Sequence, residues 1–587
     1  MICTKSNKKE KKVYEEKIAL LMAGAMTVAS LAGCGGSDKA AETTAAAKAE
    51  TTAAAAQAVP AETAAPEAAT KTLKDYPRVA GFNAMVTSGG ITDEEFNAQA
   101  LAKKICEETG YDVKFTQLPK TDVDTTVTNI FMLQEDYQYV FVTKDQFNML
   151  VSQGALAPLT EYVNASANLK EVISEVGWDS ATFDGEIYGI PNSDPRECTS
   201  KGFYYRLDWL NEYNAANPDA QIAIPSEENG YSMTASNFAK MLEFFNTKVA
   251  AGGKALTIEV DPASSDTKEE KPVYLQTILP AFGIYSEWAD VDGKLTYILD
   301  QEGFSEYAEY MEDLYDAGLI YYQATKDDTN AVNSLMNDMT GCALVSHTKP
   351  YSLETHRAPA DVKEENYDAF VDEVYSGYIA ALVPDECDGD ASAVRVWSKK
   401  LYNQYIVCPV FNTEEQTAAV VDYCDSKLDK DLFIQLTIGV EGETYEYKDG
   451  GYYPILPKFN EEMNLADKFL SGTREADYAE YWLARTRKTA AQGRMFGQIN
   501  YNIDKTGIMD PINMLPSVDV VDENYATARN AVVESLILSI FDSSKDFSLD
   551  DAKAVWNGKK GADIEAAVNE WYTTWEYKDT YNDVKPR

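Results

Sequence analysis

The chain has 587 residues and a formal net charge of −43 at pH 7, with 95 Asp and Glu against 52 Lys and Arg. So negative a chain repels phosphate backbones, which excludes nucleic acid as a partner and argues against a strongly anionic ligand. The sequence holds two histidines and no HExxH, GxxxxGK[ST] or CxxC motif, so the common zinc, nucleotide and thioredoxin-type chemistries are excluded as well. We expect no metal, no cofactor and no catalytic residue.

The first 33 residues have the features of an export signal. A segment with six lysines precedes an apolar run, Ile18 to Ala32, that is shorter than the roughly 20 residues needed to span a membrane. The run leads into Leu31-Ala32-Gly33-Cys34, which resembles a bacterial lipobox. The resemblance implies a signal peptide over 1–33 and lipidation of Cys34, which would anchor the protein at the extracytoplasmic face of the bacterial cell membrane. An ordinary secretory signal is the alternative.

Residues 34–74 are predicted to form a disordered tether. From Gly35 to about Thr72 the chain is nearly all Ala, Thr, Glu, Lys, Gly and Pro, without an aromatic residue. Such a segment cannot bury enough apolar surface to offset the entropy lost on ordering. The folded body is therefore expected from about Asp75 to Arg587, which is long enough for two or more lobes.

The first part of the body alternates strands with a helix. Thr92 and Glu95 form a capping box that opens the helix, and Gly110 is expected to end it. Strand, helix and strand with short connections predict a parallel βαβ unit at the start of an open α/β lobe. The expected strands are 78–87, 111–115 and 139–142.

A second region, from about Phe203 to Lys400, has helices of its own. The clearest is expected over Ser305 to Ala317, with Gly318 at its C-terminal end. The chain then ends in a mostly helical region, with apolar runs at Val532 to Phe541 and Ile564 to Trp575.

Several local patterns occur in a consistent order along the body, although each is weak alone. Together they resemble the family 1 extracellular solute-binding lipoproteins, which deliver sugars to ABC importers. One loop departs from the family, because Gln134 to Tyr139 stands where an SGDxPD turn is expected, and this leaves the identity of the ligand open. The patterns are 153–160 (QGALAPLT), 183–191 (FDGEIYGIP), 203–210 (FYYRLDWL), 440–445 (VEGETY) with 449–451 (DGG), 554–558 (AVWNG) and 571–575 (WYTTW).

The resemblance implies an α/β, two-lobe periplasmic-binding-protein-like fold with a ligand cleft between the lobes and a helical C-terminal region. Lobe 1 is expected over 75–193 and 404–470, and lobe 2 over 194–403 and 471–587. The chain is expected to cross between the lobes near Pro191 to Arg196 and to return near Tyr405 to Val410, and these crossings would form the hinge. The implied partners are a carbohydrate, expected to be an oligosaccharide, and the permease subunits of an ABC transporter; the protein itself is expected to be a monomer.

A sugar presents weakly apolar C–H faces that stack on aromatic rings and hydroxyls that need donors and acceptors. Aromatic and polar residues on loops near the expected hinge are therefore candidates for the ligand site. Trp209, Trp556, Trp571 and Trp575 are interpreted as core or helix-packing residues instead, because they fall at helical spacing. The candidates are Trp178, Tyr188, Asn192, Asp194, Arg196, Tyr205, Arg206, Trp288 and Trp397.

Each candidate also has a structural interpretation. Tyr188 could only support its turn, and Arg196 and Arg206 could pair with carboxylates, as basic residues usually do in an acidic chain. Two other functions remain open at this stage. One is a surface glycoside hydrolase with two catalytic carboxylates, and the other is a binding protein for a peptide or another non-sugar solute.

Overall fold

The structure is a computed structural model that describes residues 71–193, 201–260, 271, 273–323, 329–346, 366–398, 402–542 and 546–581. The predicted signal peptide, Cys34 and nearly all of the tether lie outside the described residues, as do the candidates Asp194 and Arg196. The body begins slightly earlier than predicted, because Leu73 is buried in the short helix η1 (Leu73–Asp75). Within the described residues, no helix combines the length and apolar character needed to cross a bilayer.

The body contains two five-stranded sheets, so the predicted two-lobe α/β architecture is confirmed. Each sheet contains one strand, β17 or β7, that runs antiparallel to both of its neighbours. In both cases this is the first strand after the chain arrives from the other sheet. The first sheet has the order β2 (Asp112–Gln117), β1 (Gly81–Val86), β3 (Tyr139–Thr143), β17 (Tyr402–Val407), β6 (Gly189–Ser193), and the second has the order β12 (Ile320–Gln323), β9 (Leu256–Glu259), β13 (Cys342–Ser346), β7 (Lys201–Tyr205), β14 (Gly377–Ile379).

The opening βαβ unit forms as predicted, with β1 parallel to both β2 and β3. The Thr92–Glu95 capping box is present, and Gly110 ends the segment with a φ of +75°, a value that glycine adopts without steric cost. The single helix expected between them is two helices, α2 (Asp93–Ala98) and α3 (Ala100–Thr109), because Gln99 leaves the helical conformation.

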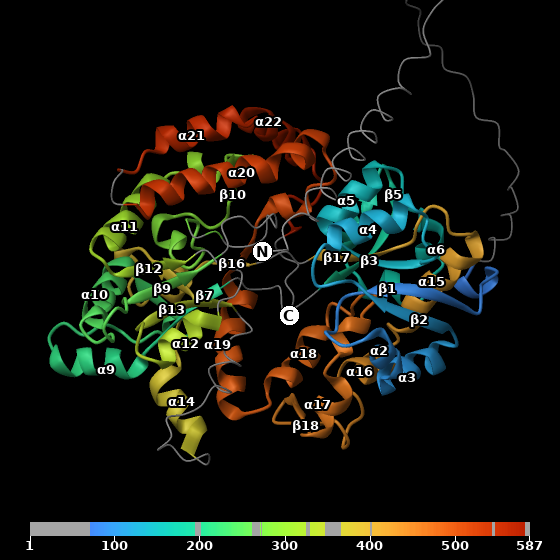
Figure 1. Ribbon diagram of the computed structural model, residues 1–587, viewed down its shortest axis with the longest axis horizontal. Helices are drawn as coiled ribbons and strands as arrows, with labels where there is room; N and C mark the ends of the chain where they lie inside the picture. The colour runs from blue at the N-terminus through green and yellow to red at the C-terminus, as the bar shows by residue number, and fades with distance from the viewer. Residues whose placement is uncertain are drawn as a thin grey trace, which may run out of the picture. The chain divides into compact units, whose positions relative to one another are not determined.

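Helices cover the first sheet and close its core (Figure 1). A cluster of buried side chains combines Ile105 of α3, Val420 of α15 and Phe433 of α16 with residues of β1 and β2. Tyr478 and Tyr481 of α18 pack on Phe433, so α18 packs with the helices of the first sheet. The helices are α4 (Val123–Met132), α5 (Lys144–Ser152), α6 (Thr160–Asn164), α7 (Leu169–Val172), α8 (Glu175–Asp179), α15 (Glu414–Ser426), α16 (Lys430–Thr437), α17 (Lys458–Met463) and α18 (Tyr478–Thr486).

The C-terminal helices pack with the second lobe. Trp556 stacks on Tyr297 of β11 (Lys294–Tyr297), with ring centroids 4.0 Å apart, and also contacts Trp288 of β10 (Trp288–Val291). Trp209 and Trp556 are therefore core residues, as interpreted from their spacing. The helices are α9 (Leu207–Ala216), α10 (Ala235–Asn246), α11 (Phe304–Asp316), α12 (Thr329–Met336), α14 (Tyr367–Tyr375), α19 (Ala490–Thr506), α20 (Asp519–Ile540), α21 (Leu549–Gly558) and α22 (Gly561–Tyr572).

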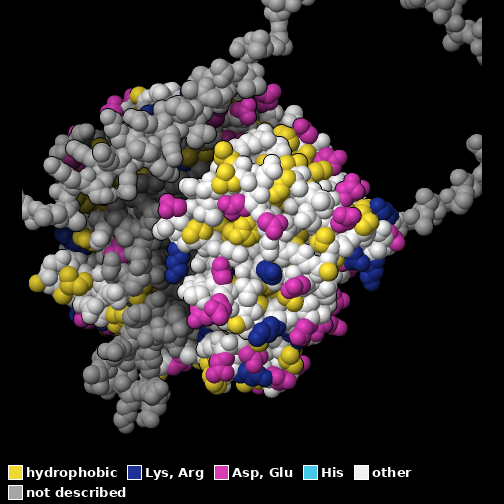
Figure 2. Space-filling view, turned by 45° about the vertical axis from the view of Figure 1, so that its right-hand side comes forward, with side chains coloured by type: hydrophobic (Ala, Val, Ile, Leu, Met, Phe, Trp, Pro, Cys, Tyr) yellow, Lys and Arg dark blue, Asp and Glu magenta, His cyan; other side chains and the backbone are white. Residues whose placement is uncertain are grey.

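Acidic side chains are spread over the face of the protein that Figure 2 displays, with fewer basic side chains among them. This matches the strongly negative net charge of the chain.

Candidate functional site

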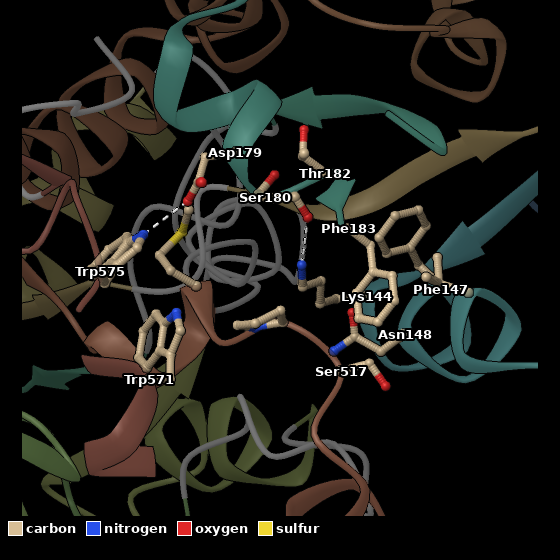
Figure 3. A pocket seen from close by; sticks show the side chains of 13 residues that line it. Lys144, Phe147, Asn148, Asp179, Ser180, Thr182, Phe183, Ser517, Trp571 and Trp575 are labelled. Carbon is tan, nitrogen blue, oxygen red and sulfur yellow. Dashed lines mark hydrogen bonds between the residues drawn. The ribbon is translucent and has the colours of Figure 1, made fainter. Parts of the chain in front are cut away.

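A pocket lies where the first lobe meets the C-terminal part of the chain (Figure 3). Its empty volume is about 420 Å³, part of which is open to solvent. The first lobe contributes residues of α5 and of the segment 179–183, while the other wall comes from the end of η10 (Pro511–Met514) and from α22 with the residues that follow it. The lining residues are Lys144, Phe147, Asn148, Val151, Asp179, Ser180, Thr182, Phe183, Met514, Pro516, Ser517, Trp571 and Trp575.

One helical face of α5 forms part of the first wall. The Thr143 side chain caps α5 at the end of β3 and accepts a hydrogen bond from the Gln146 backbone. Lys144, Phe147 and Asn148 then lie at i, i+3 and i+4, so they share one face of the helix. The Lys144 ammonium donates to the Ser180 carbonyl oxygen at 2.5 Å.

Asp179 is the acidic group of the pocket. It ends α8, and its Oδ2 accepts a hydrogen bond from the Trp575 indole nitrogen at 2.8 Å, so it joins the two walls. Partial burial raises the pKa of Asp179, although the Trp575 hydrogen bond and the Lys144 charge oppose this shift.

Two indoles, Trp571 and Trp575, form the opposite wall. Trp571 lies in α22 and Trp575 three residues beyond its end, with ring centroids at 4.9 Å and an interplanar angle of 31°. Asn569 fixes the orientation of α22, because its side chain accepts from the Leu295 N–H at 2.8 Å and donates to the Leu295 carbonyl at 2.9 Å. Trp575 is buried, whereas Trp571 is half-buried and keeps part of its surface at the pocket.

This arrangement suits a ring-shaped solute that carries hydroxyl groups. Indole faces take the apolar faces of such a ring. The Asp179 carboxylate accepts hydrogen bonds, and Asn148 and Ser517 can both donate and accept them. Pockets that combine aromatic walls with a few polar groups are typical of reversible small-molecule binding.

Where the two crossing segments meet the first lobe, hydrogen bonds connect them to one segment, 471–475. The Ser193 N–H donates to Thr473 Oγ1 at 3.0 Å, and the Tyr402 hydroxyl donates to Glu475 Oε1 at 2.8 Å. The chain leaves the first sheet after Ser193 and re-enters it at Tyr402. The outward crossing thus overlaps the predicted one, but the return at Tyr405 to Val410 was placed too late, because Tyr405 already lies within β17.

Three candidates of the first lobe, Trp178, Tyr188 and Asn192, lie within the described residues, and none of them lines the pocket. Trp178 was expected in a loop, but it lies in α8, next to Asp179. Tyr188 is half-buried against the core between β5 (Glu186–Ile187) and β6. Asn192 is buried in β6, and its side chain accepts a hydrogen bond from the Gly472 N–H.

Four further candidates lie within the described residues after Ser193, and they too lie outside the pocket: Tyr205, Arg206, Trp288 and Trp397. The loop predicted for Trp288 is wrong, because this residue opens β10, is fully buried and donates its indole N–H to the Tyr525 hydroxyl at 2.9 Å. Tyr205 is fully buried at the end of β7. Arg206 pairs with Asp208 and Asp338, as its structural interpretation predicted. Trp397 is buried in β16 (Val396–Ser398), just before the return crossing.

Sequence patterns alone did not predict the residues that form the pocket. Trp571 and Trp575 were interpreted as packing residues, and they do pack on each other, with Trp575 buried in the core, but both also line the pocket. Their spacing of four residues placed them on one helical face, but it could not show that part of this face is left uncovered. Asp179 directly follows the candidate Trp178, and this neighbourhood was the available signal.

Comparison with solved structures places this fold among two-lobe solute-binding proteins. An HMO-binding, ABC-transporter-associated solute-binding protein from Bifidobacterium longum infantis aligns at a TM-score of 0.59 and 14% identity, covering 84% of this chain and 98% of that chain. FusA of S. pneumoniae, solved with kestose, aligns at 0.57 and 14% identity, covering 85% and 100%. The N-glycan transport solute-binding protein NgtS of Streptococcus pneumoniae aligns at 0.52 and 13% identity, covering 86% and 100%.

Residues 100–398 match the model of the bacterial extracellular solute-binding protein family, and the chain belongs to this family. An uncharacterized protein from the butB 5′ region of Niallia circulans is 33% identical over 168 residues, or 29% of this chain. The match spans 65% of the length of that relative.

Proposed function

We propose that this protein captures a carbohydrate, specifically an oligosaccharide, in the pocket between its lobes and delivers it unchanged to the permease subunits of an ABC importer. The observation that carries the proposal is the indole pair Trp571 and Trp575 beside Asp179, at the junction of two lobes in a member of the solute-binding family. Three structural neighbours support it, since one is an HMO-binding protein, one was solved with kestose and one is an N-glycan transport protein.

Capture without chemistry is part of the proposal. Glycoside hydrolysis requires two carboxyl groups on either side of the scissile bond. Among the described residues that line the pocket, Asp179 is the only carboxylate. A solute-binding role needs no second one, because closure of the lobes on the ligand requires only that the closed state binds it better than the open state.

The proposal includes the cellular location of the protein. The lipobox at Leu31 to Cys34 and the low-complexity segment that follows it support a monomer held at the outer face of the bacterial cell membrane by a lipid on Cys34. Labelling of cells with a radioactive fatty acid tests the anchor. Label is expected on the wild-type protein and not on Cys34→Ser, and equal labelling of both would contradict it.

A thermal-shift screen of the full-length protein tests the ligand class. The probes are kestose, lacto-N-tetraose and an N-glycan core oligosaccharide, with tri- and tetrapeptides of similar mass as the comparison set. A ligand at 100 times its Kd stabilises the folded state by about 2.7 kcal/mol, so a clear rise in Tm is expected with a glycan. Recovery of that glycan intact by mass spectrometry separates a binding protein from a hydrolase. Shifts with peptides alone would overturn the proposal.

A further inference from the structure

The charged groups at the pocket point to the charge of its ligand, and this step rests on the function proposed above. Among the described residues that line the pocket, Lys144 is the only cation. Its side chain is buried, and the ammonium donates to the Ser180 carbonyl oxygen at 2.5 Å. It also lies 5.4 Å from the Phe147 ring centroid and 5.3 Å from that of Tyr405. The hydrogen bond of the ammonium thus runs to a first-lobe carbonyl (Figure 3), and its charge also acts on the Asp179 carboxylate.

The Asp179 carboxylate is placed to receive hydrogen-bond donors from a ligand. Among the described residues, its one hydrogen bond comes from the Trp575 indole nitrogen, at 2.8 Å on Oδ2. A carboxylate has room for further donors, such as the hydroxyls of a neutral glycan. A ligand carboxylate at the same place would bring two negative charges together, which is unfavourable.

Carboxylates from both sides of the pocket add to this effect. Asp145 directly follows the lining residue Lys144 in the first turn of α5. Asp519 and Asp522 lie in the first turn of α20, where Asp522 Oδ2 accepts a hydrogen bond from the lining residue Ser517 at 2.6 Å. Glu576 directly follows the lining residue Trp575 on the other wall. Acidic residues thus stand beside lining residues on both walls of the pocket.

We infer that this pocket selects uncharged glycans and discriminates against uronate-bearing ones, and that Asp179, with the surrounding carboxylates Asp145, Asp519 and Glu576, determines this selectivity. Each surrounding carboxylate contributes a modest part, because an exposed charge roughly 8 Å from an anion changes its binding about two- to threefold in water at low salt. Asp179 contributes more, since it lines the pocket and is partly desolvated.

Calorimetric titration of the full-length protein with paired glycans tests the inference. The pairs are galactotriose with trigalacturonate and mannotriose with trimannuronate, and kestose and lacto-N-tetraose extend the neutral set. Every glycan that binds tightly is expected to be uncharged. Within each pair, the uncharged glycan is expected to bind at least about tenfold more tightly than its uronate partner. Uronate binding as tight as that of the best neutral glycan would overturn the inference and leave the proposed function standing. Binding of no glycan of either kind would overturn both.

A double variant, Asp145→Asn with Asp519→Asn, tests whether these two carboxylates contribute to the selectivity. The ratio of neutral to uronate affinity is expected to fall about fourfold or more in 20 mM salt, and the fall should shrink in 200 mM salt because the charges are screened. Asp431→Asn is the matched control, since Asp431 is also an exposed acid in the first turn of a helix, α16, outside the pocket. An equal fall in both variants would assign the effect to net charge rather than to the pocket and would overturn the inference.

Discussion

Trp571 offers the sharpest test of the pocket as the ligand site. Its indole is half-buried and lines the pocket, so a bound sugar ring would cover one of its faces. If the ring covers roughly 60 Å² of apolar surface at about 25 cal/mol per Å², Trp571→Ala loses about 1.5 kcal/mol, or about tenfold in affinity. The variant also loses the ring contact with Trp575, so its affinity is to be measured well below its own melting temperature.

The assay is calorimetric titration of the full-length protein with the glycan that gives the largest thermal shift. Trp482→Ala is the control, because Trp482 is another half-buried tryptophan, in α18 and outside the pocket. The control is expected to bind as the wild type does. If Trp571→Ala binds every tested glycan with wild-type affinity, the stacking argument is refuted and the site lies elsewhere.

Three further predictions concern the lobe contact and the second-lobe core. Trp575→Phe keeps an aromatic ring but removes the 2.8 Å hydrogen bond to Asp179, so glycan affinity should fall several-fold; an unchanged Kd would contradict a role in closure. Burial raises the pKa of Asp510 to about 7, so its stabilising contribution is complete below pH 4 and is lost as pH rises through 7. Asp510→Asn should therefore reduce the drop in Tm between pH 5 and pH 8, and an equal drop would count against this. Glu287→Gln leaves the buried Arg529 charge without its carboxylate partner and should lower the unfolding free energy by about 3–5 kcal/mol in urea titrations, whereas a loss below about 1 kcal/mol would show that the ion pair is dispensable.

Local signals predicted the fold well where they act within a few residues. The Thr92–Glu95 capping box and the turn at Gly110 depend on neighbours in the sequence, and both are present as predicted. The two-lobe architecture followed from a series of short patterns that resemble a known family, and the match of residues 100–398 bears this out.

The site could not be predicted in the same way, because it depends on contacts between distant parts of the chain. Trp288 was predicted on a loop, with the polar residues Ser286 and Glu287 beside it. Both are buried, and Glu287 is neutralised by Arg529, which lies 242 residues further along the chain. The same holds for Trp575, whose hydrogen-bond partner Asp179 is 396 residues away.

Hydrogen exchange measured by mass spectrometry tests the central claim most directly. The full-length protein is compared with and without a saturating glycan from the thermal-shift screen. If the lobes close on a glycan in this pocket, amide exchange should slow in α5, α8 and α22 together, since these helices supply both walls. Slower exchange confined to one lobe, or no change in α22, would contradict capture between the lobes.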